Sequence, residues 1–139
     1  MSWPALLVTF GSLFAVACGG SSSGSPTGSP PAAINQPVEL APGQSTQVGP
    51  LRITFTGVSG DSRCPVDVTC VWEGDAVAEI ELRQPTSAME TRELHTASPR
   101  STTYGSYQDE LVRLDPAPRS TRTIPPASYR LVVRVTQGS

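Results

Sequence analysis

Residues 51–58 read Leu-Arg-Ile-Thr-Phe-Thr-Gly-Val, and apolar side chains alternate with polar ones along this stretch. In an extended strand, a period of two places Leu51, Ile53 and Phe55 on one face and the polar residues on the other. Such a strand buries one face and exposes the other to water, as in an antiparallel sheet. The same alternation recurs in two later stretches, residues 76–83 and 129–136.

Shorter extended segments complete this pattern. They are predicted over residues 38–40, 45–48, 92–96 and 107–114. Pairs of Pro and Gly residues separate the segments and indicate turns, and no stretch combines a helical period with capping residues. About seven short strands in about a hundred residues predict an all-β fold, an antiparallel β-sandwich with Greek-key-like connections; a small barrel is the alternative.

Length and charge limit what the chain does. Its 139 residues suit a single domain, which we predict over residues 36–137. The net charge is −2, and all ten basic residues are arginine. This balance gives no electrostatic footprint for nucleic acid or anionic lipid, so we expect no nucleic-acid partner.

The N-terminus predicts export. Residues 1–17 have the pattern of a signal peptide, because residues 5–17 form an uncharged run too short for a transmembrane helix, which needs about 20 apolar residues. The run ends in Ala15 and Ala17, followed by Cys18. This order resembles a bacterial lipobox, which implies lipidation of the Cys18 thiol and cleavage before it. The alternative is ordinary cleavage after Ala17, which would release a soluble secreted domain.

The segment after Cys18 favours the anchored alternative. Residues 18–35 are predicted to be a lipidated cysteine and a tether, because Gly, Ser and Pro dominate residues 19–33 and no strand pattern is present. A flexible coil of this length spans roughly 20 Å, enough to hold a domain clear of lipid headgroups. We therefore expect a domain outside the cytoplasm in the cell envelope, attached to a bacterial membrane through its N-terminal lipid.

The cysteine count agrees with this assignment. Three cysteines leave one unpaired in an exported protein, and lipidation of Cys18 accounts for it. Cys64 and Cys70 then remain for a disulfide in an oxidising compartment. A metal-binding pair and a redox pair are the alternatives. Only one histidine, His95, is available as a further ligand, and the spacing is longer than the Cys-x-x-Cys of redox pairs.

A distinctive motif surrounds the two cysteines. Residues 61–74 read Asp-Ser-Arg-Cys-Pro-Val-Asp-Val-Thr-Cys-Val-Trp-Glu-Gly. They resemble the Asp-Ser-Arg-Cys-Pro-x4-Cys-x-Trp-x-Gly motif of small bacterial secreted proteins and lipoproteins, a resemblance that extends over about residues 37–136. In that family the motif lies between the first long strand and the next. The resemblance implies an architecture and no chemistry.

Two roles are open for this loop, whose candidate residues are Asp61, Arg63, Asp67, Trp72 and Glu73. In the first, the loop serves folding: the disulfide fixes it, Trp72 packs over an end of the sandwich, and Arg63 pairs with a nearby acid. In the second, the rigid loop is itself a binding surface, since loops on a rigid scaffold often carry function.

Chemistry beyond binding is not indicated, and we expect neither an enzyme nor a cofactor. The chain has no nucleophile elbow and no glycine-rich phosphate loop. Its loop acids lack the regular spacing of a calcium-binding loop, so no metal ligands are assigned. The function predicted is a lipid-anchored, non-catalytic binding or envelope-associated module, and the alternative is a periplasmic metal-handling protein that uses the acidic loop and His95.

Overall fold

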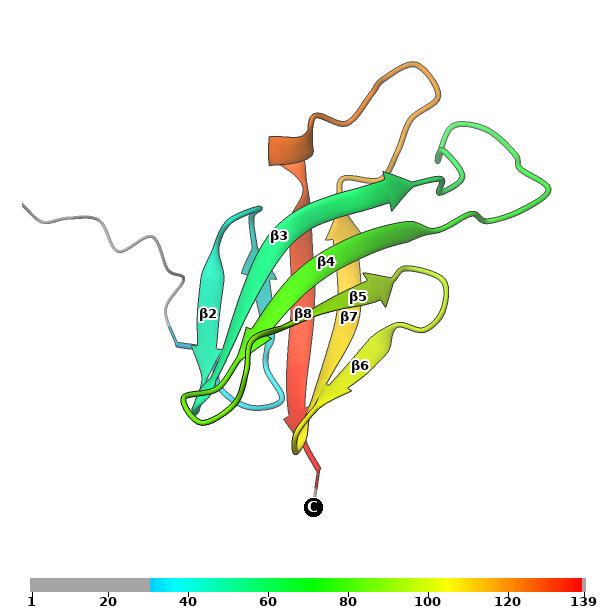
Figure 1. Cartoon of the computed structure of the whole chain (residues 1–139). Coiled ribbons are helices and arrows are strands. Elements are labelled where there is room, and N and C mark those ends of the chain that lie inside the picture. Colours follow the sequence, from blue (N-terminus) through cyan, green and yellow to red (C-terminus); the bar gives the residue numbers. More distant parts are fainter. Residues whose placement is uncertain (1–30, 139) are drawn as a thin grey trace, which may run out of the picture.

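The alternation that begins at Leu51 continues to Asp61 and forms the longest strand of a β-sandwich (Figure 1). The structure, a computed structural model, describes residues 31–138. Within this range eight strands form two four-stranded antiparallel sheets, so the predicted fold class is confirmed. They are β1 (Pro37–Leu40), β2 (Ser45–Val48), β3 (Leu51–Asp61), β4 (Ala76–Arg83), β5 (Glu90–His95), β6 (Ser101–Tyr104), β7 (Tyr107–Asp115) and β8 (Arg130–Gln137). The predicted signal peptide and Cys18 lie outside the described residues.

The strands divide between the sheets in a simple order. One sheet runs β2-β3-β4-β5 and the other runs β1-β8-β7-β6. The chain therefore changes sheet between β1 and β2 and again between β5 and β6. The sequence pattern did not predict β6, because only the last of its four residues, Tyr104, is buried.

The core lies between the two sheets and is built from the inward positions of each alternating strand. Leu51, Ile53 and Phe55 of β3 are fully buried, as their spacing predicts. On β4 the buried set is Ala76, Ala78, Ile80 and Leu82, and on β8 it includes Leu131, Val133 and Val135. Burial of these apolar side chains holds the two sheets face to face.

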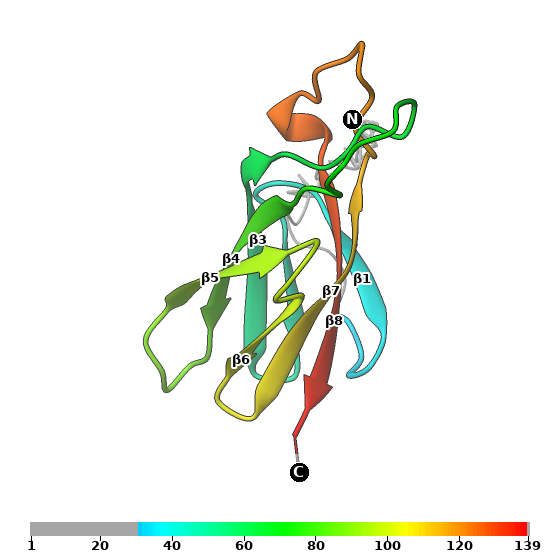
Figure 2. The same ribbon diagram turned by 90° about the vertical axis from the view of Figure 1, so that its right-hand side faces the viewer.

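The two ends of the sandwich differ. The chain enters and leaves at one end, which we call the entry end. Here the Ala32 N–H donates to the Gln47 carbonyl over 3.0 Å, and the Gly138 N–H donates to Ser106 over 2.8 Å. The opposite end, the loop end, carries the disulfide loop (62–75) between β3 and β4 and the β7–β8 loop (116–129) (Figures 1 and 2).

The contacts of the sandwich begin inside the segment predicted as tether. Besides the Ala32 hydrogen bond, the Asn35 N–H donates to the Val135 carbonyl over 2.7 Å, and Ala32 packs against the core. Helical structure in residues 31–138 is limited to a short 3-10 turn at Pro126–Ser128, and nothing there is long and apolar enough to cross a membrane as a helix.

Candidate functional site

The disulfide loop extends the β3–β4 ladder beyond the sheet. Cys64 and Cys70 form the predicted disulfide, with their Cα atoms 5.9 Å apart. Two further backbone bonds precede it: Ser62 N–H to the Asp75 carbonyl over 2.6 Å, and Cys64 N–H to the Glu73 carbonyl over 2.7 Å. The loop is thus a tapered hairpin that the disulfide closes.

Arg63 joins this hairpin to the other sheet. Its guanidinium donates to both carboxylate oxygens of Asp61, over 2.8 and 2.6 Å. It also donates to the carbonyls of Leu114 and Pro116, over 2.7 and 2.9 Å, where β7 ends. Of the acids near Arg63 in sequence, Asp61 is therefore its partner.

Tyr129 completes the cluster. This residue directly precedes β8, and its hydroxyl donates a hydrogen bond to the Asp61 carboxylate over 3.0 Å. Burial alone would raise the pKa of Asp61, but the hydrogen bonds from Arg63 and Tyr129 lower it below its ordinary value. A charged carboxylate with three side-chain hydrogen bonds thus links β3 to the ends of β7 and β8.

Asp67 fixes the tip of the disulfide loop to the β7–β8 loop. Its carboxylate accepts hydrogen bonds from the backbone N–H and the hydroxyl of Ser120, over 2.9 and 2.7 Å. These bonds lower the pKa of Asp67. The Val66 N–H adds a bond to the Pro118 carbonyl over 3.0 Å. The two loops therefore form one surface.

Asp75 and His95 form a separate pair at the base of the loop. His95 Nδ1 lies 2.5 Å from one carboxylate oxygen of Asp75. The other carboxylate oxygen of Asp75 accepts hydrogen bonds from the Thr96 hydroxyl and the Ala97 N–H. Burial acts to raise the pKa of Asp75, but these hydrogen bonds, that of His95 foremost, lower it. The loop acids thus have different partners, and residues 31–138 contain no group of three or more His, Cys, Asp or Glu residues placed to hold a metal ion.

The prediction that Trp72 packs over the end of the sandwich is wrong. Its side chain is 82% exposed, and that of Val71 is 91% exposed. Val66 and Val68 are also exposed, so four large apolar side chains face water on the disulfide loop, together with the exposed Glu73. The hairpin projects beyond the sheets, which leaves Trp72 no core to pack against. We call Val66, Val68, Val71 and Trp72 the apolar tip.

A cavity of about 470 Å³ lies in the β7–β8 loop. Its wall includes the apolar residues Pro116, Ile124 and Pro125 and the basic residues Arg119 and Arg122. Within residues 31–138, neither of these arginines forms an ion pair or a side-chain hydrogen bond. The loop end therefore combines exposed apolar groups with two cations available to a ligand.

Sequence reasoning missed this cavity and three of the four tip residues. Val66, Val68 and Val71 carry apolar side chains in a segment without strand alternation, which was the available signal. For Ser120, Arg119 and Arg122 the sequence carries no such signal, because only the folded chain brings residues 119–122 beside residues 66–67.

Removing the disulfide is expected to lower the free energy of unfolding by about 2 kcal/mol, because so short a loop restricts the unfolded chain only modestly. The variant is Cys64→Ser with Cys70→Ser, measured by urea unfolding without reductant. Adding reductant to the unmodified chain should lower its midpoint to that of the variant. Equal midpoints for variant and oxidised chain would show that the loop is held without the disulfide.

No protein-family model matches the chain, no curated protein matches it, and no solved structure matches it.

Proposed function

We propose that this chain is a non-catalytic binding module, anchored through a lipid on Cys18 and displayed outside the cytoplasm, whose recognition surface is the loop end of the sandwich. The observation that carries the proposal is the apolar tip. Exposed apolar groups that cluster on one loop are typical of interaction sites, whereas single exposed apolar residues are ordinary.

The rigidity of the tip supports a binding role. The disulfide, the Asp67–Ser120 bonds and the Arg63 cluster fix the backbone of the loop at three places. A loop held in one conformation loses little entropy on binding, so apolar contacts at Val71 and Trp72 contribute more fully to affinity. Tryptophan and arginine are also the residue types that most often dominate binding interfaces.

The position of the tip agrees with the proposed anchor. Among the described residues 31–138, Ala32 is the first that is bonded to the sandwich; it lies at the entry end, and the apolar tip lies at the opposite end. The eleven residues of β3 alone span roughly 35 Å between them. In a domain tethered at Cys18, the tip therefore lies at the end farther from the point of attachment.

Photo-cross-linking in intact cells tests the proposal. A benzoylphenylalanine at Val71 is expected to give discrete cross-linked products, and the same group at the exposed Gln108, at the entry end, is expected to give none. In the same cells, Cys18→Ser should move the protein from the membrane fraction to the soluble fraction. Equal cross-linking from both positions would contradict the recognition surface, and membrane retention of the Cys18→Ser protein would contradict the anchor.

A further inference from the structure

The ten arginines of the chain fall into two groups. Six form ion pairs or donate side-chain hydrogen bonds: Arg63, Arg92, Arg100, Arg113, Arg130 and Arg134. The other four do neither within residues 31–138. They occur as two pairs of neighbours, Arg119 with Arg122 at the loop end and Arg52 with Arg83 at the entry end.

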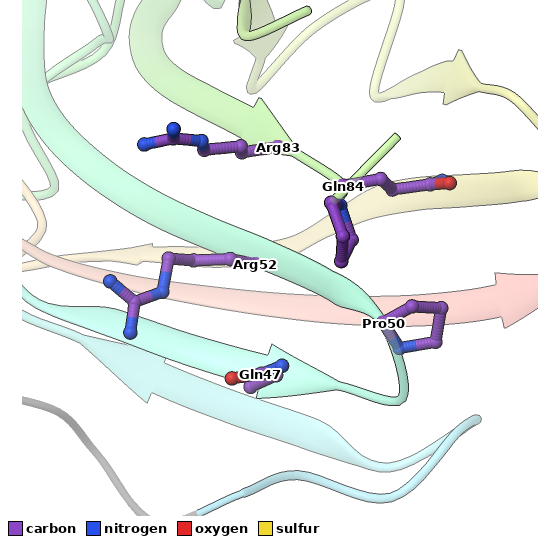
Figure 3. Close-up of a pocket in the computed structure, with 6 residues that line it drawn as sticks. Gln47, Pro50, Arg52, Arg83 and Gln84 are labelled. Carbon is purple, nitrogen blue, oxygen red and sulfur yellow. The ribbon is translucent and has the colours of Figure 1, made fainter. Parts of the chain in front are cut away.

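Arg52 and Arg83 stand directly opposite each other on β3 and β4. Both side chains are exposed and lie over the outer face of their sheet, with Gln47 nearby on β2, whereas the Gln84 side chain extends away from Arg83, toward Gly105 (Figure 3). These four residues, with Pro50 and Pro85, line a shallow cavity of about 220 Å³. The two guanidinium groups and the Gln47 amide supply hydrogen-bond donors, and among residues 31–138 no carboxylate lines the cavity.

Such a pair destabilises the free sheet. Like charges directly opposite on neighbouring strands repel each other. The nearest acid on this face of β4 is Glu81, two residues from Arg83, and neither arginine pairs with it. An oxyanion held between the two guanidinium groups would convert this repulsion into two attractive contacts, and a phosphate matches guanidinium donors in geometry and charge.

The cavity lies where the chain enters the sandwich. Gln47, one of its lining residues, accepts the hydrogen bond from Ala32 through its backbone carbonyl. Thirteen residues, 19–31, separate Cys18 from Ala32, and the tether that their composition predicts would span about 20 Å. A lipid on Cys18 therefore holds this cavity within reach of phospholipid headgroups.

We propose that Arg52 and Arg83 bind the phosphate group of membrane-lipid headgroups and so orient the entry end of the sandwich toward the bilayer. The inference rests on the proposed anchoring at Cys18. It does not depend on the net charge of −2, because the contact is local to one pair and the phosphate is present in zwitterionic as well as anionic lipids.

The test couples the chain from Cys18 onward to nanodiscs. Cys18 is the only thiol outside the disulfide, so a maleimide lipid reproduces the anchor. The discs contain phosphatidylcholine or a phosphate-free glycolipid, each with a trace of lipid carrying a gadolinium chelate. The readout is the paramagnetic broadening of the arginine Nε–H signals in NMR spectra.

In phosphatidylcholine discs, the broadening at Arg52 and Arg83 is expected to exceed that at Arg119 and Arg122 about tenfold, since the two ends are roughly 35 Å apart and the effect falls steeply with distance. In glycolipid discs this difference should become much smaller, because only the tether then holds the entry end near the surface. With Arg52→Gln and Arg83→Gln together, the broadening at the Gln84 amide should fall in phosphatidylcholine discs, whereas the matched variant Arg119→Gln with Arg122→Gln should leave it unchanged.

Three outcomes would overturn the inference: equal broadening of both pairs, the same difference in glycolipid discs, or no effect of the Arg52 and Arg83 substitutions. Inorganic phosphate added to the unanchored Cys18→Ser chain separates the two sources of phosphate. Selective shifts of Arg52 and Arg83 there, without orientation on discs, would assign the site to free phosphate and overturn the lipid assignment. The anchor in this assay is attached chemically, so the assay does not depend on lipidation in cells. Failure of the headgroup-binding inference can therefore be told apart from failure of Cys18 lipidation.

Discussion

Asp109→Asn is expected to raise the free energy of unfolding by about 4 kcal/mol at pH 8, and by less than about half of that at pH 5. Asp109 lies on β7 with its side chain in the core, fully buried and without a hydrogen-bond partner in the described chain. Burial raises its pKa from 3.8 to about 7. Asparagine has nearly the same shape and removes the ionisation.

The direction follows from proton binding. Between pH 3.8 and about 7 the folded chain holds a proton on Asp109 that the unfolded chain releases. The stabilisation that this proton binding gives the folded chain is therefore complete below pH 3.8, the pKa of Asp109 in the unfolded chain. It falls as the pH rises and is lost above about pH 7, the pKa of Asp109 in the folded chain. Strand neighbours Thr102 and Val135 carry no charge, and burial is the only cause of the shift. Asp61 and Asp75, whose pKa values are lowered, titrate below this window and leave the slope unchanged.

Urea unfolding at pH 5, 6.5 and 8 measures the effect. The unmodified chain should lose about 3 kcal/mol between pH 5 and 8, and the Asp109→Asn chain should lose almost none. Glu110→Gln is the matched control, because Glu110 lies on the same strand, half exposed, beside Arg134, and its removal should change stability by less than about 1 kcal/mol at any of these pH values. Parallel pH profiles for the unmodified and Asp109→Asn chains would show that Asp109 is not buried as a neutral acid.

Gly74→Ala is expected to destabilise the fold by about 3 kcal/mol, from the left-handed backbone and from steric overlap. Gly74 has a φ of +69° where the disulfide loop returns to β4. A Cβ atom there would lie 1.8 Å from the Ser62 carbonyl oxygen and 2.6 Å from its carbon. Both neighbours are backbone atoms of the facing strand extension, so the hairpin must open to admit the methyl group.

Gly60→Ala provides the comparison for this variant. Gly60 lies near the end of β3 with open space around its missing Cβ, and its φ is not in the left-handed region. Its replacement should change the melting temperature little. If the Gly74→Ala chain had the same melting temperature as the Gly60→Ala chain, this would contradict the close approach of Gly74 to Ser62. Loss of cross-linking from position 71 in the Gly74→Ala chain would further tie the shape of the hairpin to binding.

The parts of the fold that follow from local pattern could be predicted from the sequence. The alternation of β3, β4 and β8 gave both their faces and their core residues, and the cysteine count gave the disulfide. Trp72 was misplaced because a large apolar residue near two cysteines is expected to be buried, whereas the hairpin carries it beyond both sheets.

Features that depend on register could not be predicted in this way. Arg52 and Arg83 each occupy an ordinary outward position, and only the pairing of β3 with β4 sets them side by side. The partnership of Asp67 with Ser120 spans fifty-three positions of sequence. Asp109 did leave a signal, since it interrupts the apolar inward series of Tyr107 and Leu111 on β7, but burial without a partner is visible only in the folded chain.

The placement of the chain ends has a mechanical consequence. A partner held at the apolar tip and a lipid held at the N-terminus would pull on opposite ends of the sandwich, along the direction of its strands. Such a load shears the hydrogen bonds between strands and stretches many of them together, whereas a load across the sheet would break them one after another. With Arg63 tying the end of β3 to the end of β7, and Tyr129 tying Asp61 to the start of β8, tension entering through the disulfide loop is shared between both sheets.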